Sequence, residues 1–307
     1  MPRDSDLATV EPIRAEHPQL SVDATVVETF AALSESGLRH LGRNAEAFLA
    51  RPEPDPVHQA RVAVRRLRAL LSVFRSVLPK PERKRVAADL KRLQKALGPA
   101  RDLDVFLDEV LPKLGNDGAR RLLAGAAHEP HRRAYRQVRA ALAGAAMRRV
   151  RRDLPRLAAA VRLTRAGKKS ARDLGRKLLA QRHRGLAKRL VGSGRRSGKE
   201  LHALRIRIKK LRYAVEFFRP VMEKGGVKAY HGALAEAQDV LGRYNDAVNA
   251  RALARTLAKD AEALGPKACR DLDAVFGDAE DRERQRARKE FAALRPKLGT
   301  APKRWFR

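Results

Sequence analysis

The segment from residue 57 to residue 78 reads as a helix with one apolar side and one cationic side. At about 100° per residue, four large apolar side chains share one arc of this helix: Leu67, Leu71, Phe74 and Leu78. One imidazole and four guanidinium groups lie on the opposite arc or at its edge, and we call them the first basic row: His58, Arg61, Arg65, Arg66 and Arg68. Because the apolar arc must be buried, we expect the first basic row to face outward.

The pattern occurs a second time. The second basic row begins 144 positions later (202 − 58 = 144) and consists of His202, Arg205, Lys209, Lys210 and Arg212. The same offset relates residues beyond the rows: Leu90 to Leu234, Gln94 to Gln238, Gly98 to Gly242 and Asp102 to Asp246. A register that holds over so many positions indicates an internal duplication, so we predict a protein of two related halves.

No segment alternates apolar and polar residues as a strand does, so the sequence predicts an all-α fold. We expect the first helical half at about residues 21–164 and the second at about 165–300. A flexible tail is expected at residues 1–20 and a basic tail at 301–307. Ser21 and the two residues after it are expected to cap the first helix, which would run to about Ala50.

Two aspartates recur at the same offset, and their simplest role is structural support. A helix is expected to end at Gly98 and Pro99, after which Asp102 can cap the next helix, as Asp246 can in the second half. The alternative is that each aspartate orients one arginine of its own half. His131, next to a proline, is expected to be a surface residue rather than a metal ligand.

The charge of the chain limits its partners. It has 68 Lys and Arg against 35 Asp and Glu, a formal net charge of +33, which is best tolerated beside a polyanion. Inorganic polyphosphate, nucleic acid and an anionic membrane surface all fit. The single cysteine, Cys269, excludes an intramolecular disulfide and a Cys-rich metal site. The N-terminus lacks the apolar run of a signal peptide, so we expect a cytoplasmic protein that does not insert into membranes.

The paired motifs closely resemble those of one family. The first copy reads His-x-x-Arg-x-x-x-Arg-Arg-x-Arg followed by Leu-Gly-x-x-Arg-Asp, and the second reads His-x-x-Arg-x-x-x-Lys-Lys-x-Arg-Tyr followed by Leu-Gly-x-x-Asn-Asp. Both resemble the CHAD domain, over roughly Ser21 to Lys297. The resemblance implies two pseudo-symmetric four-helix bundles that bind inorganic polyphosphate through a basic surface, and it suggests residence at polyphosphate granules.

The basic rows are the candidate binding site. A surface needed only for solubility has no reason to repeat one register, so we expect both rows to bind phosphate in one groove. Guanidinium groups grip phosphate oxygens in pairs, whereas Lys209 and Lys210 act as point charges. His58 and His202 are expected to begin their helices, where each either contacts the anion or holds the preceding turn.

These features favour non-catalytic binding of inorganic polyphosphate. The alternative is a protein that binds the backbone of RNA or DNA, which would then compete with polyphosphate. An enzyme is not expected because the sequence offers neither an activated nucleophile nor a carboxylate set for a catalytic metal. We therefore expect no catalytic residue, no metal and no cofactor.

Overall fold

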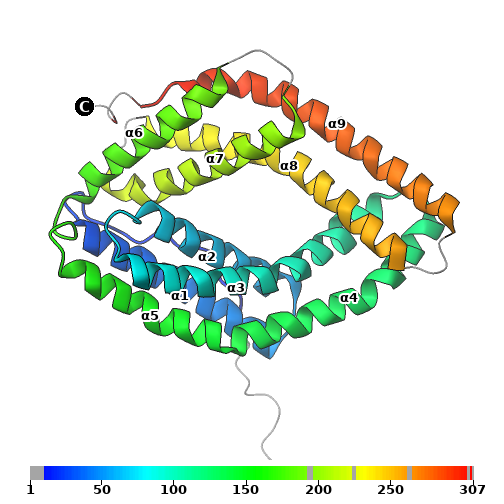
Figure 1. The fold of residues 1–307 in the computed structure, drawn as a ribbon, viewed down its shortest axis with the longest axis horizontal. Coiled ribbons are helices and arrows are strands. Elements are labelled where there is room, and N and C mark those ends of the chain that lie inside the picture. The colour runs from blue at the N-terminus through cyan, green and yellow to red at the C-terminus, as the bar shows by residue number, and fades with distance from the viewer. Residues whose placement is uncertain (1–9, 192–195, 223–225, 261–264, 303–304, 306–307) are drawn as a thin grey trace, which may run out of the picture. The chain divides into compact units, whose positions relative to one another are not determined.

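Helices make up nearly all of the described chain. The computed structural model describes residues 10–191, 196–222, 226–260, 265–302 and 305, and within these ranges only Thr25 and Ser170 form an isolated β bridge. The α-helices, drawn in Figure 1, are α1 Val26–Ala50, α2 Pro54–Val73, α3 Lys80–Val105, α4 Asp117–Ala143, α5 Ala145–Arg162, α6 Ala171–Leu190, α7 Gly198–Phe218, α8 Val227–Asp260 and α9 Pro266–Gly299. Shorter helical turns are η1 Phe106–Val110, η2 Leu111–Lys113 and η3 Arg219–Val221. The all-α prediction is confirmed.

The helices group into two compact units. Unit 1 comprises the described residues up to Gln19 together with Val27–Asp104 and Glu129–Lys168. It therefore holds α1, α2, nearly all of α3, the second part of α4, and α5. Phe30 and Phe74, whose ring centroids lie 5.4 Å apart, are fully buried in its core. Where the sequence predicts a flexible tail, the main-chain oxygen of Ile13 accepts a hydrogen bond from Asn44 of α1 at 2.9 Å.

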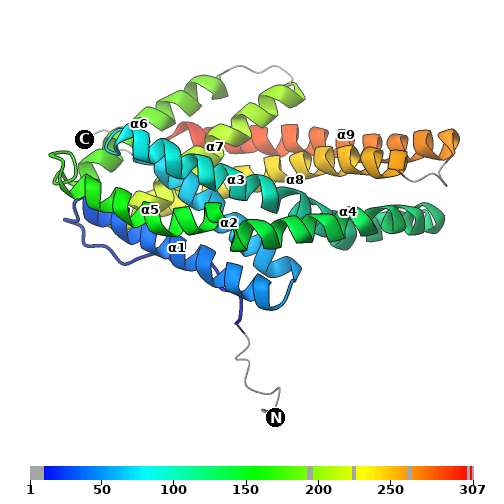
Figure 2. The same ribbon diagram turned by 60° about the horizontal axis from the view of Figure 1, so that its bottom comes forward.

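Unit 2 comprises Leu20–Val26, Val105–His128 and the described residues from Lys169 onward. Its longest helices, α8 and α9, lie side by side and run in opposite directions (Figure 1 and Figure 2). The stacked rings of Phe106 and Phe276, 6.1 Å apart, join η1 to α9. Residues 105–128 thus belong to unit 2, although they fall within the first half of the sequence. Trp305, in the predicted basic tail, is buried and packs edge-on against Tyr230 at 5.0 Å.

Several helix ends differ from the predictions. α3 continues through Gly98 and Pro99 to Val105, because Leu97, Ala100 and Leu103 extend its buried side past the proline. α1 begins at Val26 rather than at Ser21. The backbone just before α1 is used elsewhere: the Ala24 oxygen accepts from the Ala171 N–H at 3.0 Å, and the Val26 N–H donates to the Lys169 oxygen at 2.9 Å.

α2 is also shorter than predicted. It ends at Val73 instead of Leu78, and Phe74 leaves the helix with a backbone ψ of 11°. Phe74 and Leu78 nevertheless remain buried, as do Leu67 and Leu71. The apolar arc predicted from the sequence is therefore confirmed, although its last part lies in turns.

Candidate functional site

The first basic row lies on α2 in unit 1. The five side chains of the row are partly accessible to solvent, whereas the opposite arc of the helix is buried. α2 begins with Pro54, whose fixed φ suits the first position of a helix. The row is therefore held by a rigid, well-packed helix and presented at the surface.

The second basic row lies on α7 in unit 2. Ser197 and Glu200 form a capping box at the start of this helix, with the Ser197 N–H donating to Glu200 at 2.8 Å. His202 and Lys210 are exposed, and the other three members of the row are partly accessible. The structure thus places both rows at the surface of their own units.

The histidines do not begin their helices as predicted. Each stands at the fifth position, because α2 starts at Pro54 and α7 at Gly198. The backbone N–H of a fifth residue is already within the helix, so it is not a donor for an anion. At the true start of α2, Pro54 and Pro56 have no N–H, and at the start of α7 the Glu200 N–H donates to Ser197 Oγ at 3.3 Å. The histidines therefore lack the free backbone N–H groups on which the expected anion site depended.

His58 is a neutral side chain near neutral pH. Burial lowers its pKa below the ordinary value of 6.5, and the positive charges of Arg101 and Arg65 lower it further. It can donate one hydrogen bond to a phosphate without adding charge. Arg101 lies within the first Leu-Gly-x-x-Arg-Asp motif. Its place next to the repeated Asp102 could have identified it as a neighbour of the row.

A glutamine holds one arginine in each row. Arg68 Nη1 donates a hydrogen bond to Gln94 Oε1 of α3, and Arg212 Nε donates to Gln238 Oε1 of α8 at 2.9 Å. The two pairs stand at the same offset of 144 positions. Because an amide oxygen is neutral, it positions the guanidinium and leaves its full charge available.

Asp102 is not a helix cap. It lies inside α3, and its carboxylate forms an ion pair with Arg61 Nη2 at 3.4 Å. Asp246 likewise lies inside α8. The predicted capping role is wrong for both residues, because α3 and α8 continue through the positions where a helix was expected to end. For Asp102 the ion pair agrees with the alternative role of orienting an arginine. A Cβ at Gly98 would lie 3.3 Å from Arg61 Nη1, so this glycine leaves room for the guanidinium.

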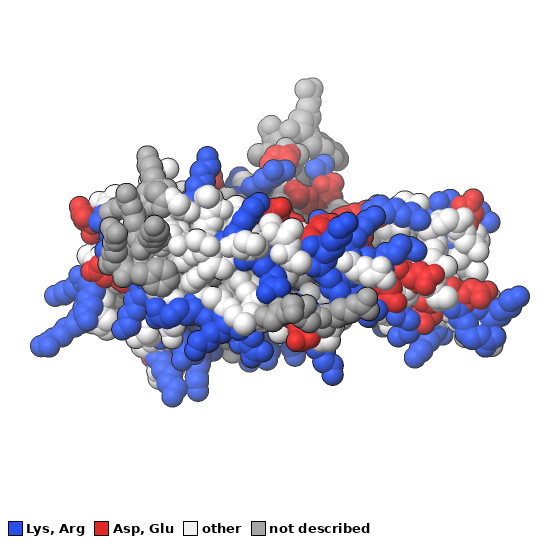
Figure 3. Space-filling model, turned by 90° about the horizontal axis from the view of Figure 1, so that it is seen from above, with Lys and Arg blue, Asp and Glu red and all other residues white. Residues whose placement is uncertain are grey.

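Much of the charge of the rows is not balanced by carboxylates. Among the described residues, no acidic side chain forms an ion pair with Arg65, Arg68, Lys210 or Arg212. Tyr213 is buried, with the Arg212 guanidinium carbon 5.3 Å from its ring centre. Elsewhere the charges are mixed: Figure 3 shows Lys and Arg crowded along the lower edge of the drawn face and acidic groups mixed with basic ones toward its right end.

Sequence reasoning missed Arg182 of α6. Its Nη1 donates to the main-chain oxygen of Lys210 at 2.7 Å, so it adds a guanidinium beside the second row. Burial lowers the pKa of Arg182. This residue lies outside the repeated motif, and no pattern in the sequence pointed to it. Arg207 of α7 falls on the arc that is apolar in α2, and its side chain is exposed. It lies against α6, where a Cβ added at Gly185 would be 3.8 Å from Arg207 Nη1.

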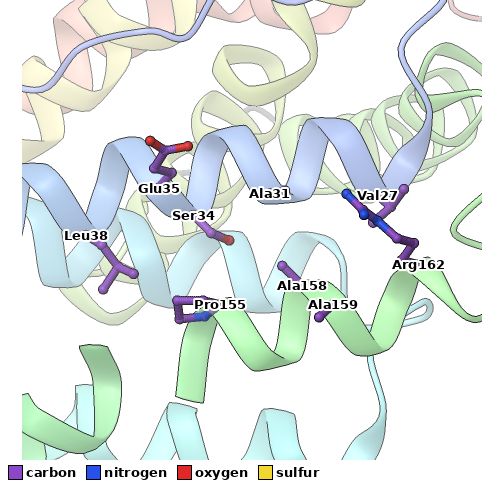
Figure 4. Close-up of a pocket in the computed structure, with 9 residues that line it drawn as sticks. All are labelled: Val27, Ala31, Ser34, Glu35, Leu38, Pro155, Ala158, Ala159 and Arg162. Atoms are coloured by element: carbon purple, nitrogen blue, oxygen red, sulfur yellow. The ribbon is translucent and has the colours of Figure 1, made fainter. Parts of the chain in front are cut away.

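Two further features of unit 1 lie outside the rows. His131 is not a simple surface residue, because its Nε2 contacts the buried Asp104 carboxylate at 2.9 Å, and the Tyr135 hydroxyl donates to the same oxygen at 3.0 Å. A mainly apolar pocket of about 440 Å³ lies between α1 and α5, where Ser34 and Leu38 face Pro155 and Ala158 (Figure 4).

The described part of the chain contains neither a metal site nor a membrane-spanning helix. There, no group of three or more His, Cys, Asp or Glu side chains is arranged to hold a metal ion. No helix in the same ranges is long and apolar enough to cross a membrane.

The fold and the two basic rows define an all-helical protein with cationic helix surfaces. The chain belongs to the CHAD domain family, whose model matches residues 32–255. A CHAD domain from the plant Ricinus communis, solved by crystallography, is 30% identical and superposes with a TM-score of 0.75 over 95% of this chain and 98% of that one. PptA from Streptomyces chartreusis shares the fold at 18% identity, with a TM-score of 0.67 over 88% of this chain and 99% of that chain. No curated protein matches the chain.

Proposed function

We propose that this protein binds inorganic polyphosphate through its two basic rows and does not catalyse a reaction on it. Membership of the CHAD domain family supports this ligand, because some members bind polyphosphate. The residues that would make the contacts are those of the two rows, with Arg101 and Arg182 as additional cations beside them.

The observation that carries the proposal is the pair of glutamine contacts. If the rows served only to stabilise the fold, carboxylates would be the better partners for Arg68 and Arg212, because ion pairs also relieve repulsion within the row. Gln94 and Gln238 instead fix each guanidinium while its charge remains uncompensated. That arrangement suits a surface whose counter-charge is supplied by a ligand.

A chain of identical phosphates also fits the composition of the rows better than nucleic acid does. Single-stranded nucleic acid is commonly held by stacking of bases on exposed aromatic rings. Tyr213, the aromatic ring that Arg212 of the second row approaches, is buried and so offers no exposed face for stacking. Polyphosphate needs only cations and hydrogen-bond donors, which the rows supply.

Competition at physiological salt tests the choice of ligand. Labelled long-chain polyphosphate on the purified protein is challenged with RNA, duplex DNA and short phosphates at equal phosphate concentration. We expect polyphosphate to resist the nucleic acids by orders of magnitude. Equal competition by all polyanions, with binding that collapses as salt rises, would identify a generic cationic surface and favour nucleic acid as the partner.

Charge reversal tests the rows themselves. Arg65→Glu with Arg66→Glu should weaken polyphosphate binding, and adding Lys209→Glu with Lys210→Glu should weaken it much further if both rows bind one chain. Circular dichroism should show unchanged helix content. Folded variants that bind like the parent would rule out the rows as the site. The four-residue variant therefore tests the prediction that both rows bind polyphosphate in a single groove.

The non-catalytic part of the proposal has its own test. Purified protein is incubated with polyphosphate and with Mg²⁺ or Mn²⁺, and free phosphate is followed. We expect no release above the protein-free control.

We also propose that the protein resides in the cytoplasm at polyphosphate granules. A fluorescent fusion should therefore lie on the granules in cells, and the four-residue variant should become diffuse.

A further inference from the structure

A second cationic site lies on unit 1, in a pocket of about 740 Å³ between α3 and α5. Five arginines and three carboxylates line it, so its formal charge is +2 (5 − 3). The arginines are Arg85 and Arg92 of α3 and Arg149, Arg152 and Arg156 of α5.

The arginine pocket is separate from the first basic row. Arg85 and Gln94 are nine residues apart on α3, which corresponds to about half a turn around the helix axis. Gln94 holds Arg68 of the row, whereas Arg85 lines the pocket. One side of α3 therefore serves the row and the opposite side serves the pocket.

Carboxylates hold the arginines of the pocket in place. The buried Asp89 accepts from Arg149 Nε at 3.0 Å and Nη2 at 2.8 Å, and from Arg92 at 2.6 Å. Asp153 accepts from Arg152 Nε at 2.7 Å and Nη2 at 2.9 Å. These hydrogen bonds lower the pKa of both aspartates, so the carboxylates stay charged and keep the guanidinium groups oriented.

The arginines retain donors that these contacts do not use. Arg149 and Arg152 both bind their aspartates through Nε and Nη2, and within the described residues Nη1 of each has no acceptor. Arg156 is mostly exposed, and its Nη1 lies 3.8 Å from Asp153, too far for a hydrogen bond. A phosphate group can accept several such donors at once, and guanidinium groups match its geometry.

The charged residues of the pocket do not recur at the offset of 144 positions. At the offset of 144, α8 carries Ala229, Ala233 and Glu236 where α3 carries Arg85, Asp89 and Arg92. A helix with the same repeated contacts thus forms without these charges. These charges occur on α3 and not at the matching positions of α8, so helix packing alone does not explain them.

We propose that the arginine pocket binds a compact phosphate dianion, either the end of a short oligophosphate or a phosphate monoester. Arg149, Arg152 and Arg156 of α5 donate to its oxygens, and Asp89 and Asp153 position them. The charge of +2 matches a terminal phosphate. This site is independent of the basic rows, so it does not rest on the proposed function.

The experiment places a reporter thiol in the pocket. Ala88 is exposed and lines the pocket, so Ala88→Cys in a Cys269→Ser background introduces one reactive thiol there. Its alkylation by neutral iodoacetamide is timed at physiological salt with tripolyphosphate, with glycerol phosphate, or with matched NaCl. We expect tripolyphosphate or glycerol phosphate at millimolar concentration to slow alkylation by about tenfold, and which of the two protects better identifies the source of the phosphate.

Two double variants make the result specific. Arg152→Gln with Arg156→Gln should abolish the protection, whereas Arg133→Gln with Arg139→Gln, which removes two exposed charges of α4, should preserve it. Arg65→Glu with Arg66→Glu should also preserve it, so failure of the basic rows is distinguishable from failure of the pocket. Absence of protection by either phosphate up to about 10 mM, or equal loss in the pocket and α4 variants, would overturn the proposal.

Discussion

Two glutamine side chains determine how much charge the basic rows present. Gln94 and Gln238 fix the guanidinium groups of Arg68 and Arg212 without cancelling them. Arg61 shows the other arrangement, because its partner Asp102 is a carboxylate 3.4 Å away. Either kind of partner can hold an arginine in position, but only a carboxylate also neutralises its charge. Replacing a glutamine by a glutamate should therefore change the net charge of the pair and leave the position of the arginine unchanged.

Gln94→Glu together with Gln238→Glu should keep both hydrogen bonds and neutralise two cations. We expect affinity for polyphosphate to fall by about tenfold or more, because each charge-assisted contact is worth about 1.5–3 kcal/mol and tenfold corresponds to about 1.4 kcal/mol. Fluorescence anisotropy with labelled polyphosphate measures this. The control is Gln94→Ala with Gln238→Ala, which keeps the charge and should lose less. An equal loss in the two variants would mean that charge is not what the glutamines preserve.

His58 makes a prediction about pH. Its pKa in the folded protein is below 6.5, so the unfolded chain binds more protons than the folded one once the pH falls below about 6.5. Unfolding free energy should therefore be unaffected by His58 above that pH and should decrease as the pH falls toward 5. Urea unfolding at pH 7.5 and pH 5.5 should show a smaller loss for His58→Gln than for the parent. An equal loss would place His58 outside the pH response.

At the scale of helices, apolar periodicity predicted more than turn residues did. It identified the buried arc of α2, but the Gly98–Pro99 pair was wrongly interpreted as a helix end. Pro99 is exposed, so its ring and missing N–H face solvent while buried residues on the other side of α3 continue the helix. Whether a proline faces solvent or the core depends on tertiary packing, and local sequence does not contain that information.

The two related glycines of α3 and α8 form a matched pair. Around Gly242 the space for a Cβ is open, so Gly242→Ala should raise the unfolding free energy by about 0.5–1 kcal/mol, the usual gain in a helix interior. At Gly98 a Cβ would lie 3.3 Å from Arg61 Nη1, so Gly98→Ala should gain less and should weaken polyphosphate binding. Urea unfolding and binding assays on both variants decide this. Equal stabilisation by the two changes would show that Gly98 is not reserved for Arg61.

At the scale of the whole molecule, the recurrence of residues at an offset of 144 positions is enough to identify the residues of both rows from the sequence. It also marks Gln94 and Gln238 as repeated residues, although not as partners of the arginines, because a helix-to-helix hydrogen bond leaves no trace in spacing. Arg182 and the arginine pocket could not be predicted for a related reason. Their residues converge from different helices, and the register of packing between helices is set by the folded core.

The net charge of +33 raises the question of whether the rows or the overall field bind polyphosphate. For single-stranded nucleic acids, log K falls with log salt concentration by about 0.7 per phosphate neutralised, and a linear polyphosphate should behave similarly. Arg65→Gln with Arg66→Gln should therefore reduce the slope by about 1.4 if both side chains contact phosphates. Arg133→Gln with Arg139→Gln gives the same net charge of +31 (33 − 2) and should leave the slope unchanged. Titrations at several salt concentrations distinguish these outcomes: equal slopes for the two variants would assign binding to the field of the whole protein, whereas a smaller slope for the row variant alone would assign it to local contacts.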